Sequence, residues 1–216
     1  MAAVAHELSP REKILEAAEA LFARRGFSGV GLSEIAEAVG VSKSSLFHHF
    51  ATKAQLHAAV VERILAEIEA ALVRTLAVGG TPIERLDRWI DTLIDLLGEQ
   101  PAHARLLMRS MFEDDELSGT LDEERAANQT LARIIESASQ LLREGMAQGQ
   151  LRMASIPHLL QSLIGMLIYH FASGDFGAEM LGRPVFAPAE VRRRKDEVKA
   201  LIHHGLVTPA ASRKGA

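Results

Sequence analysis

Residues 33–56 read SEIAEAVGVSKSSLFHHFATKAQL, and the organisation of the chain can be worked out from this stretch. Its first half carries apolar side chains at helical spacing, namely Ile35, Ala36 and Val39. Glycine commonly ends a helix, which suits Gly40 to that role. Ser42 has a side-chain oxygen that can cap the start of a second helix over residues 43–49. Two short helices joined by a glycine turn of three or four residues describe a helix-turn-helix.

Both flanks of this stretch predict further helices. Upstream, residues 9–12 (SPRE) form a capping box with proline at the first helical position. The apolar stripe that follows is Ile14, Leu15, Ala18, Leu21 and Phe22. Downstream, residues 52–55 (TKAQ) form another capping box and open a long helix. Its apolar stripe is Leu56, Val60, Ile64, Ile68, Ala71 and Leu72.

The remainder of the chain also predicts helices. Residues 81–84 (TPIE) form a third capping box. Further helices are expected at about 101–112, 120–148, 156–173 and 188–204. Between residues 174 and 188, several glycines and two prolines without a sustained period predict a long loop. We therefore expect an all-α fold, with an N-terminal three-helix helix-turn-helix domain at residues 1–57 and a C-terminal helical bundle at residues 58–216.

The stretch at residues 33–56 closely resembles the DNA-binding signature of the TetR family, the tetracycline-repressor-like regulators. The matching positions are Ile35-Ala36, Gly40-Val41-Ser42, Ser45-Leu46-Phe47, Phe50, Lys53 and Leu56. The resemblance covers residues 14–56, and beyond them only the length and the helical architecture agree. It implies a ligand-responsive transcriptional regulator, most simply a repressor that binds a palindromic operator as a homodimer and is released by a hydrophobic or aromatic small molecule.

The physical requirements of DNA recognition point to the same region. A recognition helix presents short polar and basic groups to base edges and phosphates while its other face packs on the preceding helices. No carboxylate occurs from Ala38 to Val61, so this window can approach phosphates without repulsion. Residue 53 lies in the first turn of the long helix, where free amides also favour a phosphate. We expect DNA contacts from Ser33, Lys43, Ser44, Ser45, Phe47, His48 and Lys53.

Two positions depart from the family pattern. Phe47 stands where the family usually has tyrosine, which removes a hydroxyl group that can bond a phosphate. Gly31 stands where a threonine is common, and we expect Ser33 to take over part of that contact. For Phe47, packing against the protein is an equally good interpretation of the sequence. Ser42 is a helix cap in preference to a base-reading residue.

The family resemblance also implies a ligand cavity inside the helical bundle. Such a cavity needs an apolar lining and a few polar groups that orient the ligand. The candidates at suitable helical positions are Trp89, His103, Leu107, Met108, Met111, Phe112, Met166, Tyr169 and His170. Each of them also suits an ordinary core, in which methionine fills irregular gaps.

The resemblance further implies a dimer seam built from the helices expected at about 120–148 and 156–173. The second of these has more apolar surface than one face needs, so some residues are expected to serve both core and partner: Leu160, Leu163, Ile164, Leu167 and Phe171. The small Gly165 would permit a close approach of two helices.

Other functions find little support in the sequence. It has no nucleophile elbow, phosphate loop or dinucleotide fingerprint, so we expect no catalytic residues and no enzyme. The histidines form neither an HExxH motif nor an i, i+4 pair, so we expect no metal and no other cofactor. We expect no membrane association, because the longest uncharged run, about residues 159–174, is shorter than a membrane span. The chain has no cysteine and does not begin with a signal-peptide pattern, which favours the cytoplasm.

One alternative within the same class stays open. The chain could be a helix-turn-helix regulator without a small-molecule ligand that is controlled by protein contacts. The formal net charge of −4 argues against non-specific coating of nucleic acid in either case, so DNA binding is expected from a local patch.

Overall fold

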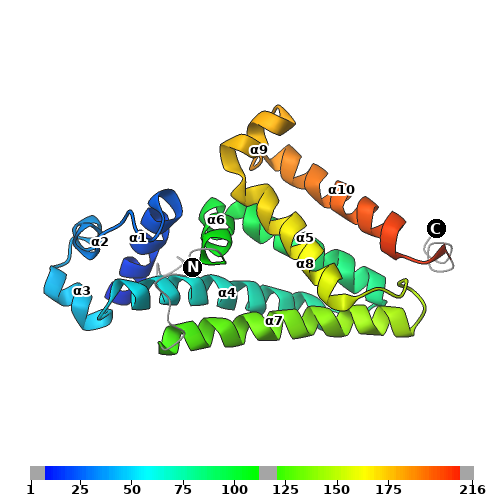
Figure 1. Ribbon diagram of the computed structural model, residues 1–216, viewed down its shortest axis with the longest axis horizontal. Helices are drawn as coiled ribbons and strands as arrows, with labels where there is room; N and C mark the ends of the chain where they lie inside the picture. Colours follow the sequence, from blue (N-terminus) through cyan, green and yellow to red (C-terminus); the bar gives the residue numbers. More distant parts are fainter. Residues whose placement is uncertain (1–7, 112–120, 210–216) are drawn as a thin grey trace, which may run out of the picture.

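The computed structural model describes residues 8–111 and 121–209 (Figure 1). The described residues form helices, with an isolated antiparallel bridge between Leu151 and Val207, and the expected all-α fold class is confirmed. The helices are α1 (Pro10–Arg25), α2 (Leu32–Val39), α3 (Lys43–His49), α4 (Lys53–Ala77), α5 (Pro82–Glu99), α6 (Pro101–Ser110), α7 (Asp122–Ala147), α8 (Ile156–Ala172), α9 (Gly174–Leu181) and α10 (Pro188–Leu206).

Helices α1, α2 and α3 fold together at one end of the molecule (Figure 1). The largest side chains that they bury are Ile14, Phe22, Ile35, Leu46 and the adjacent Phe50. The turn between α2 and α3 depends on Gly40, which has φ 74° and ψ 27° and donates its N–H to the carbonyls of Ala36 and Glu37. This left-handed conformation favours glycine, so the sequence fixes the angle between the two short helices locally.

Helix α4 runs from this three-helix module along the rest of the molecule, and α7 lies parallel to it (Figure 1). Near the first turns of both helices, Gln55 Nε2 donates to Glu123 Oε1 at 2.7 Å. Further along, Arg133 Nε donates to Glu69 Oε1 at 2.5 Å, and this hydrogen bond lowers the pKa of Glu69. The boundary expected between residues 57 and 58 falls inside α4, so one continuous helix belongs to both parts of the chain.

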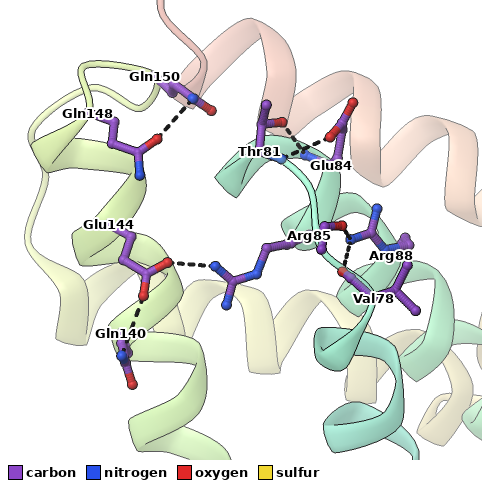
Figure 2. Close-up of polar contacts among 10 residues, drawn as sticks. Val78, Thr81, Glu84, Arg85, Arg88, Gln140, Glu144, Gln148 and Gln150 are labelled. Carbon is purple, nitrogen blue, oxygen red and sulfur yellow. Dashed lines mark hydrogen bonds and ion pairs between the residues drawn. The ribbon is translucent and has the colours of Figure 1, made fainter.

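The turn between α4 and α5 is held by a single arginine and a helix cap (Figure 2). Arg88 Nη2 donates to the carbonyl oxygens of Val78 and Gly79, each at 2.6 Å. Thr81 Oγ1 accepts from the backbone N–H of Glu84 at 3.3 Å, while the Glu84 carboxylate accepts from the backbone N–H of Thr81 at 2.9 Å. The capping box expected at residues 81–84 is therefore present, and it fixes where α5 begins.

Ion pairs and hydrogen bonds on two faces of α5 join it to α7 and α10. Arg85 donates to Glu144 of α7 at 2.6 Å (Figure 2). Toward α10, three aspartates spaced four residues apart meet three basic residues with the same spacing: Asp87 with His203 at 2.8 Å, Asp91 with Lys199 at 2.9 Å and Asp95 with Lys195 at 2.5 Å. Residues four apart share a helix face, so this series aligns the two antiparallel helices along their length.

The long loop expected after residue 173 contains the helix α9, so that expectation was wrong. A Cβ atom at Gly177 would lie 2.1 Å from Ser173 Oγ and 3.2 Å from Val185 Cγ1, so glycine is needed there for close packing. Gly182 ends the helix in a left-handed conformation with φ 68°. The glycines that lower the helix propensity of this segment are the residues that allow the helix to pack and to stop.

Candidate DNA-binding surface and effector cavity

Helix α3 presents its polar side chains outward from a buried anchor. Leu46 is fully buried and Phe50 is 1% exposed, whereas Lys43, Ser44 and His48 are exposed. The helix begins where Ser42 Oγ accepts from the backbone N–H of Ser45 at 3.0 Å, so Ser42 acts as a cap. This arrangement leaves one face of α3 free of apolar packing and of carboxylates.

The remaining predicted DNA contacts lie around the same surface. Phe47 is 42% exposed, and the centre of the Phe47 ring lies 5.8 Å from Lys43 Nζ. Ser33 is exposed in the first turn of α2, and Ser45 is half-buried. The structure therefore places an aromatic ring and a lysine side by side on the outer face of α3, where an aromatic face favours a cation.

Lys53 has a partner within the protein. Its Nζ donates to the backbone carbonyl oxygen of Phe27 at 3.1 Å and lies 4.2 Å from the centre of the Phe27 ring. Lys53 begins α4, and Phe27 follows α1, so this contact attaches the first turn of α4 to the end of α1. An ammonium group has three donors, so one such contact leaves capacity for a phosphate oxygen.

A cavity of about 380 Å³ lies between α4, α5, α6, α7 and α8. This volume is within the range of pockets that hold small organic ligands. Its wall is mostly aliphatic, and the described residues that line it include Val61, Leu65, Ile68, Leu93, Leu97, Leu131, Ile134, Leu160, Ile164 and Leu167. Such a wall favours the apolar part of a ligand, because burial removes that surface from water.

The ligand candidates from the sequence separate into two groups. Trp89, Leu107 and Met111 line the cavity. The candidates outside its lining are His103, Met108, Met166, Tyr169 and His170, while Phe112 lies outside the described residues. Tyr169 is half exposed on the outer face of α8. Burial, and next the charge of Arg194, lower the pKa of His170 to about 4, so this imidazole is neutral at pH 7.

Sequence reasoning missed the polar residues of the cavity. Glu124 is 6% exposed and His57 is 2% exposed, and both line it together with Asn128. Because α4 and α7 are parallel, His57 near the start of α4 and Glu124 near the start of α7 lie at the same end, which faces α1–α3. The available signal was the position of Glu124 within the apolar stripe of α7, three residues before Ala127 and seven before Leu131.

The cavity is in contact with the three-helix module through His57. The imidazole packs edge-on against the rings of Phe22 and Phe27, with both pairs of ring centres 5.2 Å apart. Phe27 in turn holds the ammonium of Lys53. A short series of direct contacts therefore joins the cavity wall to a basic residue at the edge of the predicted DNA-binding surface.

Comparison with known proteins agrees with this architecture. Residues 14–60 match the family described as bacterial regulatory proteins, tetR family, and residues 82–202 match the tetracyclin repressor-like C-terminal domain. The chain belongs to the TetR family. As a member of it, the protein is a transcriptional regulator and not an enzyme.

Individual relatives of this TetR-family chain are distant in sequence. The transcriptional regulator RutR of Escherichia coli K12 is 28% identical over 175 residues, covering 79% of this chain and 76% of RutR. The structure of the ketosteroid transcriptional regulator KstR2 of Mycobacterium tuberculosis has a TM-score of 0.74 at 18% identity, covering 95% and 100% of the two chains. AibR, solved in complex with isovaleryl coenzyme A and operator DNA, has a TM-score of 0.73 at 19% identity, covering 89% and 97%.

The two departures from the TetR pattern have clear positions. Gly31 is the N-cap of α2 and makes no side-chain cap, and a Cβ atom built there would meet nothing within 4 Å. Phe47 is exposed, so its ring is not packed in the core. Both positions therefore have space for the hydroxyl-bearing residue that the family usually carries.

Most of the apolar residues of α8 that were expected to serve both the core and a partner are used by the core alone. Leu160, Leu163, Leu167 and Phe171 are buried within the protomer, none more than 7% exposed, because they pack against the other helices. They are therefore not free to contact a partner, and that expectation was wrong for these four. The outward face of α8 carries Gln161, Ser162, Gly165 and Tyr169.

Residues 8–111 and 121–209 contain neither a metal-binding cluster nor a membrane span. No three His, Asp or Glu side chains gather there in a way that could hold a metal ion. Within the same ranges, no helix is both long enough and apolar enough to cross a membrane.

Proposed function

We propose that this protein is a repressor that binds a palindromic operator as a homodimer and releases it when an apolar or aromatic small molecule occupies the cavity. In this proposal, residues 1–57 bind DNA and residues 58–216 sense the ligand and dimerise in the cytoplasm. The observation that carries the proposal is the packing of His57, a residue of the cavity wall, against Phe22 and Phe27 of the three-helix module. AibR supports it as a similar fold whose structure contains both operator DNA and a small molecule.

The DNA contacts in this proposal come from the exposed face of α3 and its neighbours. Lys43, Ser44 and His48 reach base edges and nearby phosphates, since they are exposed on α3. Ser33, Ser45 and Phe47 border the same surface and contact the DNA backbone. Lys53 contacts a phosphate from the first turn of α4 while Phe27 holds its ammonium in place.

The homodimer forms, in this proposal, through the outward face of α8. One recognition helix covers only a few base pairs, so two copies related by a two-fold axis are needed to read a palindrome. Gly165 is exposed on that face, and a Cβ atom there would meet nothing within 4 Å in the protomer. Two α8 helices can therefore approach closely at this point, with Tyr169 covering the adjacent surface.

Release works by a change in the angle of α4. The two recognition helices must enter successive major grooves, about 34–36 Å apart, so a small tilt of both α4 helices destroys the simultaneous fit. A ligand between α4 and α7 acts on this angle because both helices line the cavity. It shifts the balance only by its difference in affinity for the two arrangements, which in allosteric proteins amounts to about 1–3 kcal/mol.

The test combines DNA footprinting with a ligand titration. The protein should protect two half-sites related by a two-fold axis in promoter DNA from its own genomic neighbourhood. Trp89 is the only tryptophan and lines the cavity, so its fluorescence should respond to an apolar probe such as 1-octanol. Failure to retard any such promoter DNA at low salt would overturn the operator proposal. Footprints without any fluorescence response would favour a regulator controlled by protein contacts.

A further inference from the structure

The cavity contains a buried carboxylate with an unused acceptor. Glu124 is 6% exposed and lines the cavity near the first turn of α7. Its Oε2 accepts from the backbone N–H of Leu121 at 3.4 Å, a long hydrogen bond. Its Oε1 is buried and has no hydrogen-bond partner among the described residues. A buried acceptor without a donor costs free energy, so a ligand that supplies a donor to Oε1 should bind more tightly.

The cavity wall contains one carboxylate, Glu124, and one imidazole, His57. Among the described residues that line the cavity, Glu124 is the acidic one, and lysine and arginine do not occur there. An anionic group placed beside Glu124 would be repelled and would find no lysine or arginine in that lining. A cationic donor would instead form a charge-assisted hydrogen bond with Oε1, and the low polarity of the surroundings strengthens such a bond.

We propose that the effector is an apolar molecule that carries a protonated amine, and that this amine binds Glu124 while the apolar part fills the aliphatic end of the cavity. This inference rests on the proposed function of the cavity as the effector site. It narrows that function from apolar ligands in general to amphiphilic amines. The described lining offers no lysine or arginine to the phosphate groups of a coenzyme A thioester, so the proposal does not extend to that class of ligand.

The position of Glu124 connects the amine to DNA release. Glu123, the adjacent residue, accepts a hydrogen bond from Gln55 in the first turn of α4. His57 lies at the same end of the cavity, against Phe27. A charged group bound at Glu124 therefore sits where α7 contacts the part of α4 that is nearest to α1–α3.

The experiment uses three probes with the same eight-carbon chain: n-octylamine, 1-octanol and octanoate. Each is titrated into the full-length protein, and Trp89 fluorescence reports binding. At pH 7 the amine is protonated, like that of a lysine side chain. We expect n-octylamine to bind at least about tenfold more tightly than 1-octanol, as a hydrogen bond to a charged group implies. Octanoate is expected to bind most weakly.

Two variants assign the preference to one carboxylate. Glu124→Gln keeps the shape and can still accept from Leu121, and it should bring the affinity for n-octylamine to within about threefold of that for 1-octanol, because the charge-assisted bond is lost. Asp122→Asn removes an exposed carboxylate from the same helical turn. It should bind the three probes in the same order of affinity as the unmodified protein. If Glu124→Gln does not fold, the order of the affinities of the three probes for the unmodified protein decides whether the effector is an amine.

The outcomes distinguish this inference from the function on which it rests. If 1-octanol binds but n-octylamine binds no more tightly, or if octanoate or octanoyl-coenzyme A binds more tightly, the amine proposal is overturned and the cavity remains an effector site. If Glu124→Gln retains the full preference for the amine, the assignment to Glu124 is overturned. If none of the probes changes the fluorescence, the effector cavity itself is rejected, and the amine proposal with it.

Discussion

The imidazole Nε2 of His103 lies 3.2 Å from Oε1 of Glu19, although the two residues come from the first and the sixth helix of the chain. His103 is buried and Glu19 is half-buried, with side-chain exposures of 5% and 12%. Arg63 of α4 donates to the other oxygen of the same carboxylate. Glu19 therefore joins α1 of the DNA-binding module to α4 and to α6 of the sensor part, as a second connection beside that of His57.

Replacing Glu19 with glutamine should destabilise the protein at neutral pH. Burial raises the pKa of Glu19, but hydrogen bonds and charges from His103 and Arg63 together lower it below its ordinary value of 4.5. A lowered pKa in the folded state means that the carboxylate stabilises the fold above pH 4.5 and that this contribution is lost as the pH falls through the folded-state pKa. We expect Glu19→Gln to cost about 1–3 kcal/mol at pH 7 and progressively less below pH 4.5.

Thermal unfolding followed from pH 7 to pH 3 measures this dependence. Glu34→Gln is the matched control, because Glu34 pairs with Arg25 at the surface, and exposed ion pairs contribute about 0–1 kcal/mol. A difference between wild type and Glu19→Gln that stays constant down to pH 3 would contradict the role assigned to the carboxylate.

Removing the charge of Lys53 should weaken binding to every DNA sequence alike. Lys53→Met keeps the aliphatic stem over the Phe27 ring but removes the ammonium that we place on a phosphate. The slope of log affinity against log salt should fall by about one. Lys43→Ala or His48→Ala should in addition change the relative affinity for operator and random DNA. Filter binding at several salt concentrations distinguishes the two kinds of residue, and equal losses on both DNAs for all three variants would remove the base-reading assignment.

Phe47→Tyr should strengthen DNA binding. The ring is 42% exposed on the outer face of α3, so the hydroxyl needs no new space and can reach a phosphate. The contact is neutral, so we expect a gain of about 0.5–1.5 kcal/mol on operator and random DNA with little change in the salt slope. The same titrations measure it. A loss of affinity would show that the bare edge of Phe47 contacts the DNA.

His57→Leu should uncouple ligand from operator without abolishing either binding event. Leucine keeps an apolar wall in the cavity but loses the edge-on contacts with Phe22 and Phe27. In the wild type, n-octylamine should weaken operator binding by the same factor by which operator weakens n-octylamine binding, since linkage is reciprocal. For His57→Leu this factor should approach one. Matched titrations measure both directions, and an unchanged factor would place the connection elsewhere.

A charge on the outward face of α8 should give monomers. Gly165→Glu introduces it at a position where a side chain meets nothing within 4 Å of its Cβ atom, so the protomer should fold normally. Gly205→Glu is the control, because Gly205 is also exposed, helical and without near neighbours. Sedimentation velocity should show a monomer for the first variant and a dimer for the second. A dimeric Gly165→Glu would place the seam on another face.

Much of the DNA-binding half could be predicted because its determinants are local. Gly40 needs a left-handed backbone, Ser42 caps the helix that follows it, and Leu46 and Phe50 repeat at helical spacing, so neighbouring residues specify the helix-turn-helix. Local patterns predicted a loop after residue 173, where the structure has the helix α9. There, Gly177 lowers helix propensity, but a Cβ atom at this position would meet Ser173 Oγ and Val185 Cγ1, and no local pattern reveals the contact with Val185.

The sequence by itself determined the family, the all-α class and the exposed face of α3, because caps, turns and helical periodicity act within a few residues. Only the tertiary structure decided which residues form the cavity and which connect it to α1. Glu124 lines the same end of the cavity as His57 because α7 lies parallel to α4, and Glu19 meets His103 across 84 positions of sequence. An apolar stripe predicts that a helix face is buried, but the packing of distant helices determines what that face contacts.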